Sequence, residues 1–77
     1  MEEFIYYDAL FLDRPAYHLC ACHYAHSVEE CKKAIDEAEC RKEGQRFTIT
    51  KTTVHTFHSE SGEFLRREEI TEAVETY

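Results

Sequence analysis

The segment between Ser27 and Gly44 carries both the start and the stop signal of an α-helix, and it constrains the fold more than any other part of the chain. Glu30 follows Ser27 at the spacing of a capping box, in which the serine side chain bonds the Glu30 amide and the glutamate reaches back to the Ser27 amide. A glycine such as Gly44 commonly ends a helix in a left-handed turn. The sequence therefore predicts a helix over residues 28–43.

The apolar residues of this helix recur three and four positions apart and so form a single stripe. They are Val28, Cys31, Ala34, Ile35 and Ala38. Acidic residues lead the segment and basic residues close it, which complements the helix dipole. A helix with one apolar stripe covers one face of a sheet, so the opposite face is expected to stay open.

Four strands are predicted around the helix. Residues 4–12 and 16–25 are aromatic and apolar stretches on either side of a turn that contains the only proline, and they predict a hairpin. Residues 46–58 are rich in Thr, Val, Ile and Phe, which are residue types that favour strands. A turn at Gly62 then predicts that residues 63–69 pair back as a second hairpin.

The tail allows two interpretations. Ile70, Ala73, Val74 and Tyr77 are spaced as a helical stripe, but the segment is too short to be a stable helix by itself, so we expect a short helix or a frayed end. The predicted fold is α+β, a single domain over residues 1–77. Its order is ββαββ, with a four-stranded antiparallel sheet and one helix packed on one face.

The chain is acidic, with 16 acidic and nine basic residues and a formal net charge of −7. Direct nucleic-acid binding needs clustered Lys and Arg, so we do not expect it. The charge favours a larger protein with a basic surface as partner, although a negative charge also serves simple solubility. The sequence contains no predicted signal peptide and no apolar run long enough to cross a membrane, so a cytoplasmic protein with reduced cysteines is expected.

The four cysteines suggest a zinc- or thiol-dependent module as an alternative. Within one helix, Cys31 and Cys40 would lie about 13 Å apart along the axis, too far for a disulfide. Cys31 is predicted to be buried and Cys40 exposed. Cys20 and Cys22 share one face of an extended strand, where Cys31 and His18 could complete a metal site, but their spacing is unlike that of a zinc knuckle. We predict no cofactor.

An enzyme is not expected either. The sequence has no glycine-rich phosphate loop and no Gly-x-Ser-x-Gly motif. A thiol–imidazole pair such as Cys22 with His55 would need an electropositive environment to activate the thiol, and the chain is acidic. The carboxylates that occur in pairs are expected to be solvated.

Tyrosines supply the strongest functional hypothesis. One helix leaves about half of the sheet aromatics uncovered, and Tyr is enriched at protein interfaces. The predicted partner-binding residues are Tyr6, Tyr7, Glu60, Glu63, Glu68 and Glu69. The alternative is a structural homodimer joined through the open sheet face.

In size, acidity and element order, the chain resembles small phage-encoded inhibitors of bacterial defence nucleases, anti-CRISPR proteins among them. The resemblance lies in the first hairpin, the helix capped by Ser27 and the second hairpin at Ser61-Gly62-Glu63, and it covers most of the chain without a diagnostic motif. It implies a non-enzymatic inhibitor that blocks a nucleic-acid groove sterically or by mimicking DNA.

Overall fold

The computed structural model describes all 77 residues and is built on a four-stranded antiparallel sheet of order β2-β1-β3-β4. This confirms the predicted α+β class and the antiparallel four-stranded sheet. The chain contains two short helices, not one, and neither is long or apolar enough to cross a membrane. The elements are β1 (Glu2–Phe11), β2 (Arg14–His18), the 3₁₀ turn η1 (Cys20–Cys22), α1 (Val28–Glu37), α2 (Glu39–Lys42), β3 (Phe47–His58) and β4 (Phe64–Thr76).

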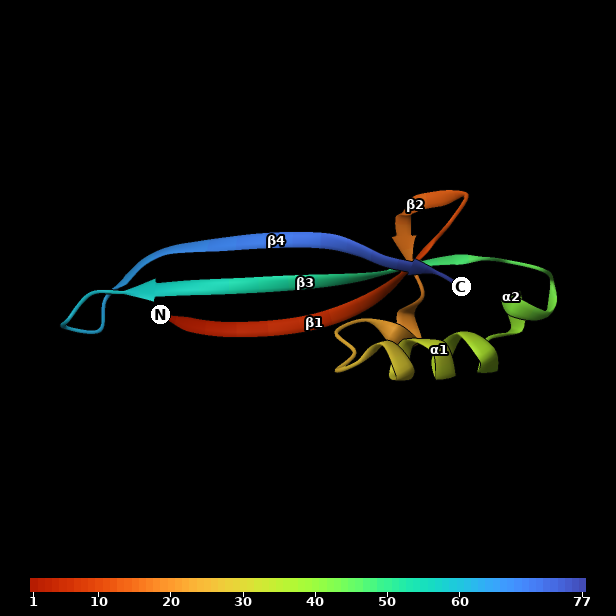
Figure 1. The fold of residues 1–77 in the computed structure, drawn as a ribbon, viewed down its shortest axis with the longest axis horizontal. Coiled ribbons are helices and arrows are strands. Elements are labelled where there is room, and N and C mark those ends of the chain that lie inside the picture. The colour runs from red at the N-terminus through yellow and green to blue at the C-terminus, as the bar shows by residue number, and fades with distance from the viewer.

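The molecule is elongated, with extents of 52 × 20 × 17 Å. Figure 1 shows that both helices and β2 gather at one end, while three strands continue toward the far end. We call the first part the head and the second the arm, which comprises residues 2–6 and 52–71. A helix of ten residues, such as α1, spans about 15 Å, whereas the twelve residues of β3 extend over about 40 Å. The helix therefore covers only the head.

The hydrophobic core lies in the head, between α1 and the sheet. Its six buried residues are Ala9, Cys22, Cys31, Ile35, Phe47 and Ile49. We call the sheet face that contacts α1 the helix face, and the opposite one the open face. Because β1 pairs with β3 from Glu2↔Thr56 to Phe11↔Phe47, alternate residues of both strands project onto each face along the whole arm.

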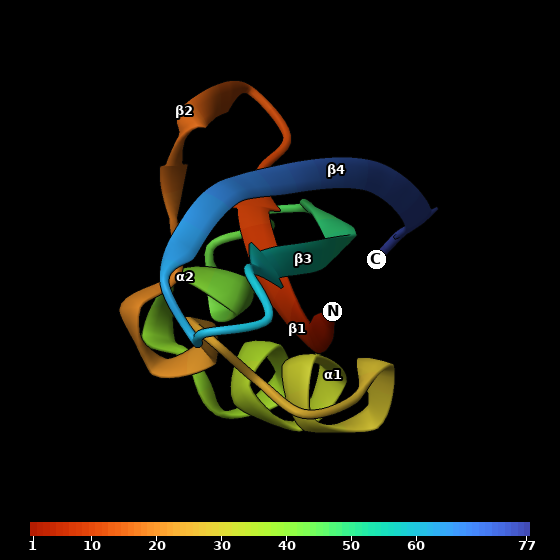
Figure 2. The same cartoon turned by 90° about the vertical axis from the view of Figure 1, so that its left-hand side faces the viewer.

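Strand β3 is shielded on the open face as well. Thr50 and Thr52 are buried there, and the Thr52 hydroxyl lies 2.9 Å from that of Thr71 on β4. Figure 2 shows the reason, because β4 arches over β3 in a strongly curled sheet. The central strand is thus protected by its neighbours, although no helix covers this face.

The helix begins as predicted but ends early. The Ser27 side chain accepts a hydrogen bond from the Glu30 amide at 3.1 Å, whereas Glu30 bonds the His26 amide and not that of Ser27. The predicted continuous helix over residues 28–43 is wrong, because Ala38 is extended (φ −76°, ψ 137°) and separates α1 from α2. Because of this break, Cys40 lies half-buried against the core. The prediction that it is exposed is therefore wrong.

The second predicted strand is shorter than expected, because it ends at His18 and not at residue 25. The Leu19 amide bonds the Ala9 carbonyl oxygen at 2.8 Å, and η1 then carries Cys22 into the core. There Cys22 forms a disulfide with Cys31 of α1, with their Cα atoms 5.2 Å apart. The expected placement of Cys20 and Cys22 on one strand face, and the expected reduced state of all four thiols, are therefore wrong.

The tail forms neither the short helix nor the frayed end that were expected, since residues 70–76 continue β4. A β-bulge explains the helix-like spacing: Ile49 pairs with Glu75 and Thr50 with Ala73, so β4 contains one extra residue at this point. In a regular strand, two residues seven positions apart would project onto opposite faces. The bulge instead returns the chain to the helix face at its last residues.

Tyr77 fastens the end of β4 to the head. Its amide bonds the Phe47 carbonyl oxygen at 2.7 Å, and its hydroxyl donates to the Asp36 carboxylate of α1 at 2.9 Å. Arg41 of α2 lies over the ring, with its guanidinium carbon 4.7 Å from the ring centre, and also bonds the Tyr77 carbonyl oxygen. The Arg46 side chain bonds the same oxygen at 3.1 Å.

The disulfide is expected to stabilise the head. Cys22 and Cys31 are nine positions apart, and closing a loop of this size contributes about 2–3 kcal/mol in the chain-entropy description. The double variant Cys22→Ala/Cys31→Ala should lose at least this much free energy of unfolding in a denaturant titration. The exposed Cys20 supplies the control, since Cys20→Ala should change stability by less than about 0.5 kcal/mol. Equal stability of the double variant and the wild type would contradict this role.

Tyr77 should titrate at a higher pH than an ordinary tyrosine. The hydrogen bond to Asp36 is the main cause of its raised pKa, with desolvation and the Asp36 charge adding to it. The neutral hydroxyl therefore stabilises the fold below pH about 10, and this stabilisation is lost as the pH rises through the higher pKa of the folded state. In an ultraviolet titration, Tyr77→Phe should remove the last tyrosinate transition, and the exposed control Tyr17→Phe should not.

Candidate functional site

The predicted partner-binding residues do not form one patch. Tyr6 lies on the open face, whereas Tyr7 lies on the helix face and packs half-buried against the core. Glu69, opposite Val54, lies on the open face, whereas Glu68, opposite His55, lies on the helix face. Glu60 and Glu63 lie in the hairpin connection at the tip of the arm. The six residues therefore spread over both faces and the tip.

The arm is strongly acidic. It contains six glutamates and two arginines, and both arginines pair with glutamates of their own strand: Arg66 with Glu68 at 3.2 Å and Arg67 with Glu69 at 2.6 Å. Glu60 and Glu63 have no ion-pair partner and are both exposed. The strongest unneutralised charge of the arm is therefore at its tip.

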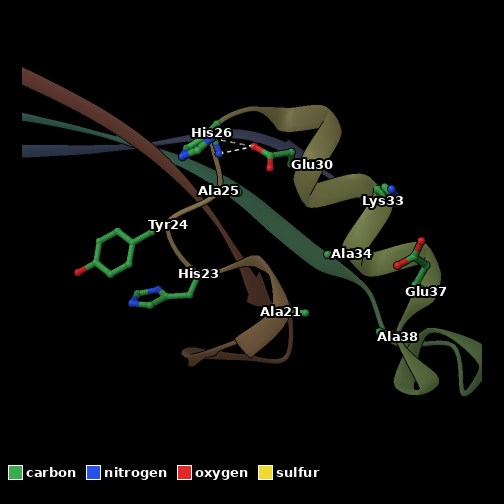
Figure 3. Close-up of a pocket in the computed structure, with 10 residues that line it drawn as sticks. All are labelled: Ala21, His23, Tyr24, Ala25, His26, Glu30, Lys33, Ala34, Glu37 and Ala38. Carbon is green, nitrogen blue, oxygen red and sulfur yellow. Dashed lines mark hydrogen bonds and ion pairs between the residues drawn. The ribbon is translucent and has the colours of Figure 1, made fainter.

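A contiguous row of rings lies where the arm meets the head. Adjacent ring centres are 4.0–5.8 Å apart along the series Phe4, Tyr6, Tyr24, His23 and His18, which we call the aromatic strip. Figure 3 shows that His23 and Tyr24 point away from α1. The strip combines residues of β1 and β2 with those of the segment after η1, so segments distant in sequence build it.

Asp8 fixes the orientation of His23. One of its carboxylate oxygens lies 2.8 Å from Nδ1 of His23, and its side chain is only 14% exposed. A carboxylate only accepts hydrogen bonds, so Nδ1 carries the proton that it donates. The other ring nitrogen remains outside this bond, and the ring stacks on His18 with centres 4.3 Å apart.

Tyr24 is the one non-glycine residue with a positive φ, at 59°. This left-handed conformation costs about 1–2 kcal/mol for a residue with a side chain. The next residue, Ala25, holds it in place by exchanging two hydrogen bonds of 2.9 Å with Tyr7. The ring of Tyr24 is thereby placed 4.5 Å from that of Tyr6.

A cavity of about 590 Å³ adjoins the strip, between residues 21–26 and α1. Four alanines and the exposed polar residues of α1 line it (Figure 3). His23 and Tyr24 also line it, although their rings point away from α1. Glu30, Lys33 and Glu37 give its α1 side one more carboxylate than cations. The lining residues are Ala21, His23, Tyr24, Ala25, His26, Glu30, Lys33, Ala34, Glu37 and Ala38.

The thiols do not gather as the metal hypothesis requires. Cys22 and Cys31 are bonded to each other, which leaves only Cys20 and His18 of the proposed set as free donors. The structure brings no three His, Cys, Asp or Glu side chains together in a group that could hold a metal ion. A thiolate site would require reduction of the disulfide.

Known proteins add no identification. The chain matches no family model, no curated protein and no solved structure. The candidate site is therefore assigned from its own geometry.

The sequence identifies only part of the strip in advance. Tyr6 is among the predicted partner-binding residues, but His18 is considered only as a metal ligand, and His23 is not singled out. One signal does stand in the sequence: Asp8 is the single charged residue within the apolar stretch 4–12. A carboxylate in such a strand needs a partner, and His23 is that partner.

The Tyr24 backbone gives a direct test of the strip. Tyr24→Ala removes the ring contacts but keeps a side chain in the left-handed conformation, whereas Tyr24→Gly removes both. Tyr24→Gly should therefore be about 1 kcal/mol more stable than Tyr24→Ala, the reverse of the order expected in a regular strand. Tyr17→Ala, at a ring 65% exposed outside the strip, should change the free energy of unfolding by less than about 0.5 kcal/mol. If alanine is as stable as glycine at position 24, the left-handed backbone is wrong.

Proposed function

We propose that this protein is a non-enzymatic binding protein that inhibits a larger partner by inserting its arm into a basic, nucleic-acid-binding site. The observation that carries the proposal is the arm itself. It lies beyond the reach of both helices, and β4 is exposed over nearly its full length. The arm contributes little to the protein's own hydrophobic core, so its exposed surface is available to bind a partner.

Charge determines the kind of partner. The arm contains four more acidic than basic residues, and the chain as a whole is acidic. Such a field attracts basic surfaces and speeds association with them. Carboxylates displayed along a narrow three-stranded arm imitate the charge of a nucleic-acid backbone, which supports blockade of a nucleic-acid groove.

The arm is less suited to a structural homodimer. Both faces and the outer edge of β4 carry charged side chains, including Arg67, Glu68 and Glu69. Charges on an edge strand are a common device against strand pairing between copies. This observation favours a different molecule as the partner.

The tip carboxylates provide the test. In affinity capture from the source cells, Glu60→Gln/Glu63→Gln should reduce the recovered partner about tenfold, since each lost charge contact removes up to about 1 kcal/mol. The matched control is Glu29→Gln/Glu43→Gln, which changes the net charge equally at two exposed head residues without ion-pair partners. Double-stranded DNA in excess should release the captured partner from this protein, because both would compete for the same basic site on the partner.

Two results would contradict the proposal. One is equal recovery of the partner by the tip variant and the wild type. The other is recovery that does not change with salt between about 0.05 and 0.3 M, since contacts between exposed charges weaken with ionic strength. Light scattering that finds a stable dimer through the arm would support the homodimer instead.

A further inference from the structure

We infer that the aromatic strip binds arginine side chains of the basic partner. The inference rests on the proposed function, because it names the chemical groups that a basic partner would place on this protein. It assigns a binding role to Phe4, Tyr6, Tyr24 and His23, separate from the acidic tip of the arm.

The first support is the availability of the ring faces. Phe4 and Tyr24 are 52% and 51% exposed, although both contact Tyr6. Isolated exposed apolar residues are normal, but a continuous row of rings is a contact surface. Aromatic rings bury a large area at a small cost in conformational entropy, which suits them to interfaces.

The second support is that the protein places its own cations over rings outside the strip. Arg14 lies over Phe11, Arg66 over Phe57, and both Arg41 and Lys32 over Tyr77, at 4.0–5.2 Å from the ring centres. No cation of the chain lies over a ring of the strip. The strip is a row of cation-binding faces that the protein leaves free of its own cations.

The third support is the distribution of carboxylates around the strip. Asp8 bonds His23 within it, and Glu69, which pairs with Arg67, lies on the same face across Val54 from Phe4. A guanidinium group stacks its plane on a ring while its edge donates to a carboxylate, and lysine cannot do both with the same geometry.

The strip is also rigid before anything binds. Asp8 holds the ring of His23, and the paired hydrogen bonds between Ala25 and Tyr7 hold the backbone next to Tyr24. The buried disulfide fixes Cys22, the residue immediately before His23, to α1. Preorganised side chains lose less conformational freedom on binding, which increases the affinity.

Nucleobases stack on rings as well, but the surrounding charge opposes them. A nucleic-acid strand brings one phosphate for each base, and the chain carries a formal net charge of −7. Proteins that stack single strands on rings use a positively charged groove. The arginine side chain combines the required ring-stacking plane with the opposite charge.

The test uses two acetylated peptides of equal length, one with four arginines separated by glycines and the other with four lysines. In NMR titrations of the wild-type protein near 0.15 M salt, the arginine peptide should bind about fivefold more tightly than the lysine peptide. The shifted resonances should include those of Tyr6, His23 and Tyr24.

Variants then locate the preference. Tyr6→Leu and Tyr24→Leu keep apolar volume but remove a ring, so each should bring the two peptides to equal affinity. Tyr17→Leu, outside the strip, should preserve the fivefold difference. The tip variant Glu60→Gln/Glu63→Gln should also preserve it, because the tip attracts both peptides alike.

Equal binding of both peptides by the wild type would overturn the inference, as would an arginine preference that survives both ring substitutions. Tighter binding of an oligothymidine strand than of the arginine peptide would identify a base-stacking surface and overturn it too. These outcomes leave the proposed function intact, since that proposal is contradicted by a different result: capture of the partner that is independent of the tip charges or of salt.

Discussion

The ladder between β1 and β3 is the interaction on which the rest of the structure depends. It runs without a bulge from Glu2↔Thr56 to Phe11↔Phe47, so it joins the arm to the head in one continuous sheet. Its inner end supplies Ala9, Phe47 and Ile49 to the core, while its outer end has no helix to pack against. The core is therefore confined to one end, and strand pairing alone extends the fold into the arm.

The sequence predicts correctly those helix starts and turns that depend on residues close together in the chain. Ser27 begins the helix because its side chain satisfies a backbone amide three residues away, and Gly62 turns the second hairpin because it adopts a positive φ of 88°. Neither result needs a distant contact. The same is true of β3, whose β-branched residues favour a strand wherever it pairs.

The errors arise where distant contacts outweigh local preference. The sequence near Ala38 contains no residue that predicts a break in the helix. The extended backbone there lets α2 place Arg41 over the ring of Tyr77. The tail reads as a helical stripe because a β-bulge changes the alternation, and that bulge is visible only once the pairing with β3 is known. Among the cysteines, Cys31 is correctly predicted to be buried, but its partner depends on η1, which the extended pattern of residues 16–25 conceals.

The arrangement also explains why the aromatic strip continues from the base of the arm onto the head. Tyr6 and Phe4 belong to the ladder, but the rings that extend the row come from a segment that only the head can hold. Cys22 anchors that segment to α1, and Ala25 returns it to the edge of β1 beside Tyr7. These two attachments lie on either side of His23 and Tyr24, so the left-handed backbone at Tyr24 is fixed at both ends. The disulfide that supports a small core therefore also determines where the strip presents its rings.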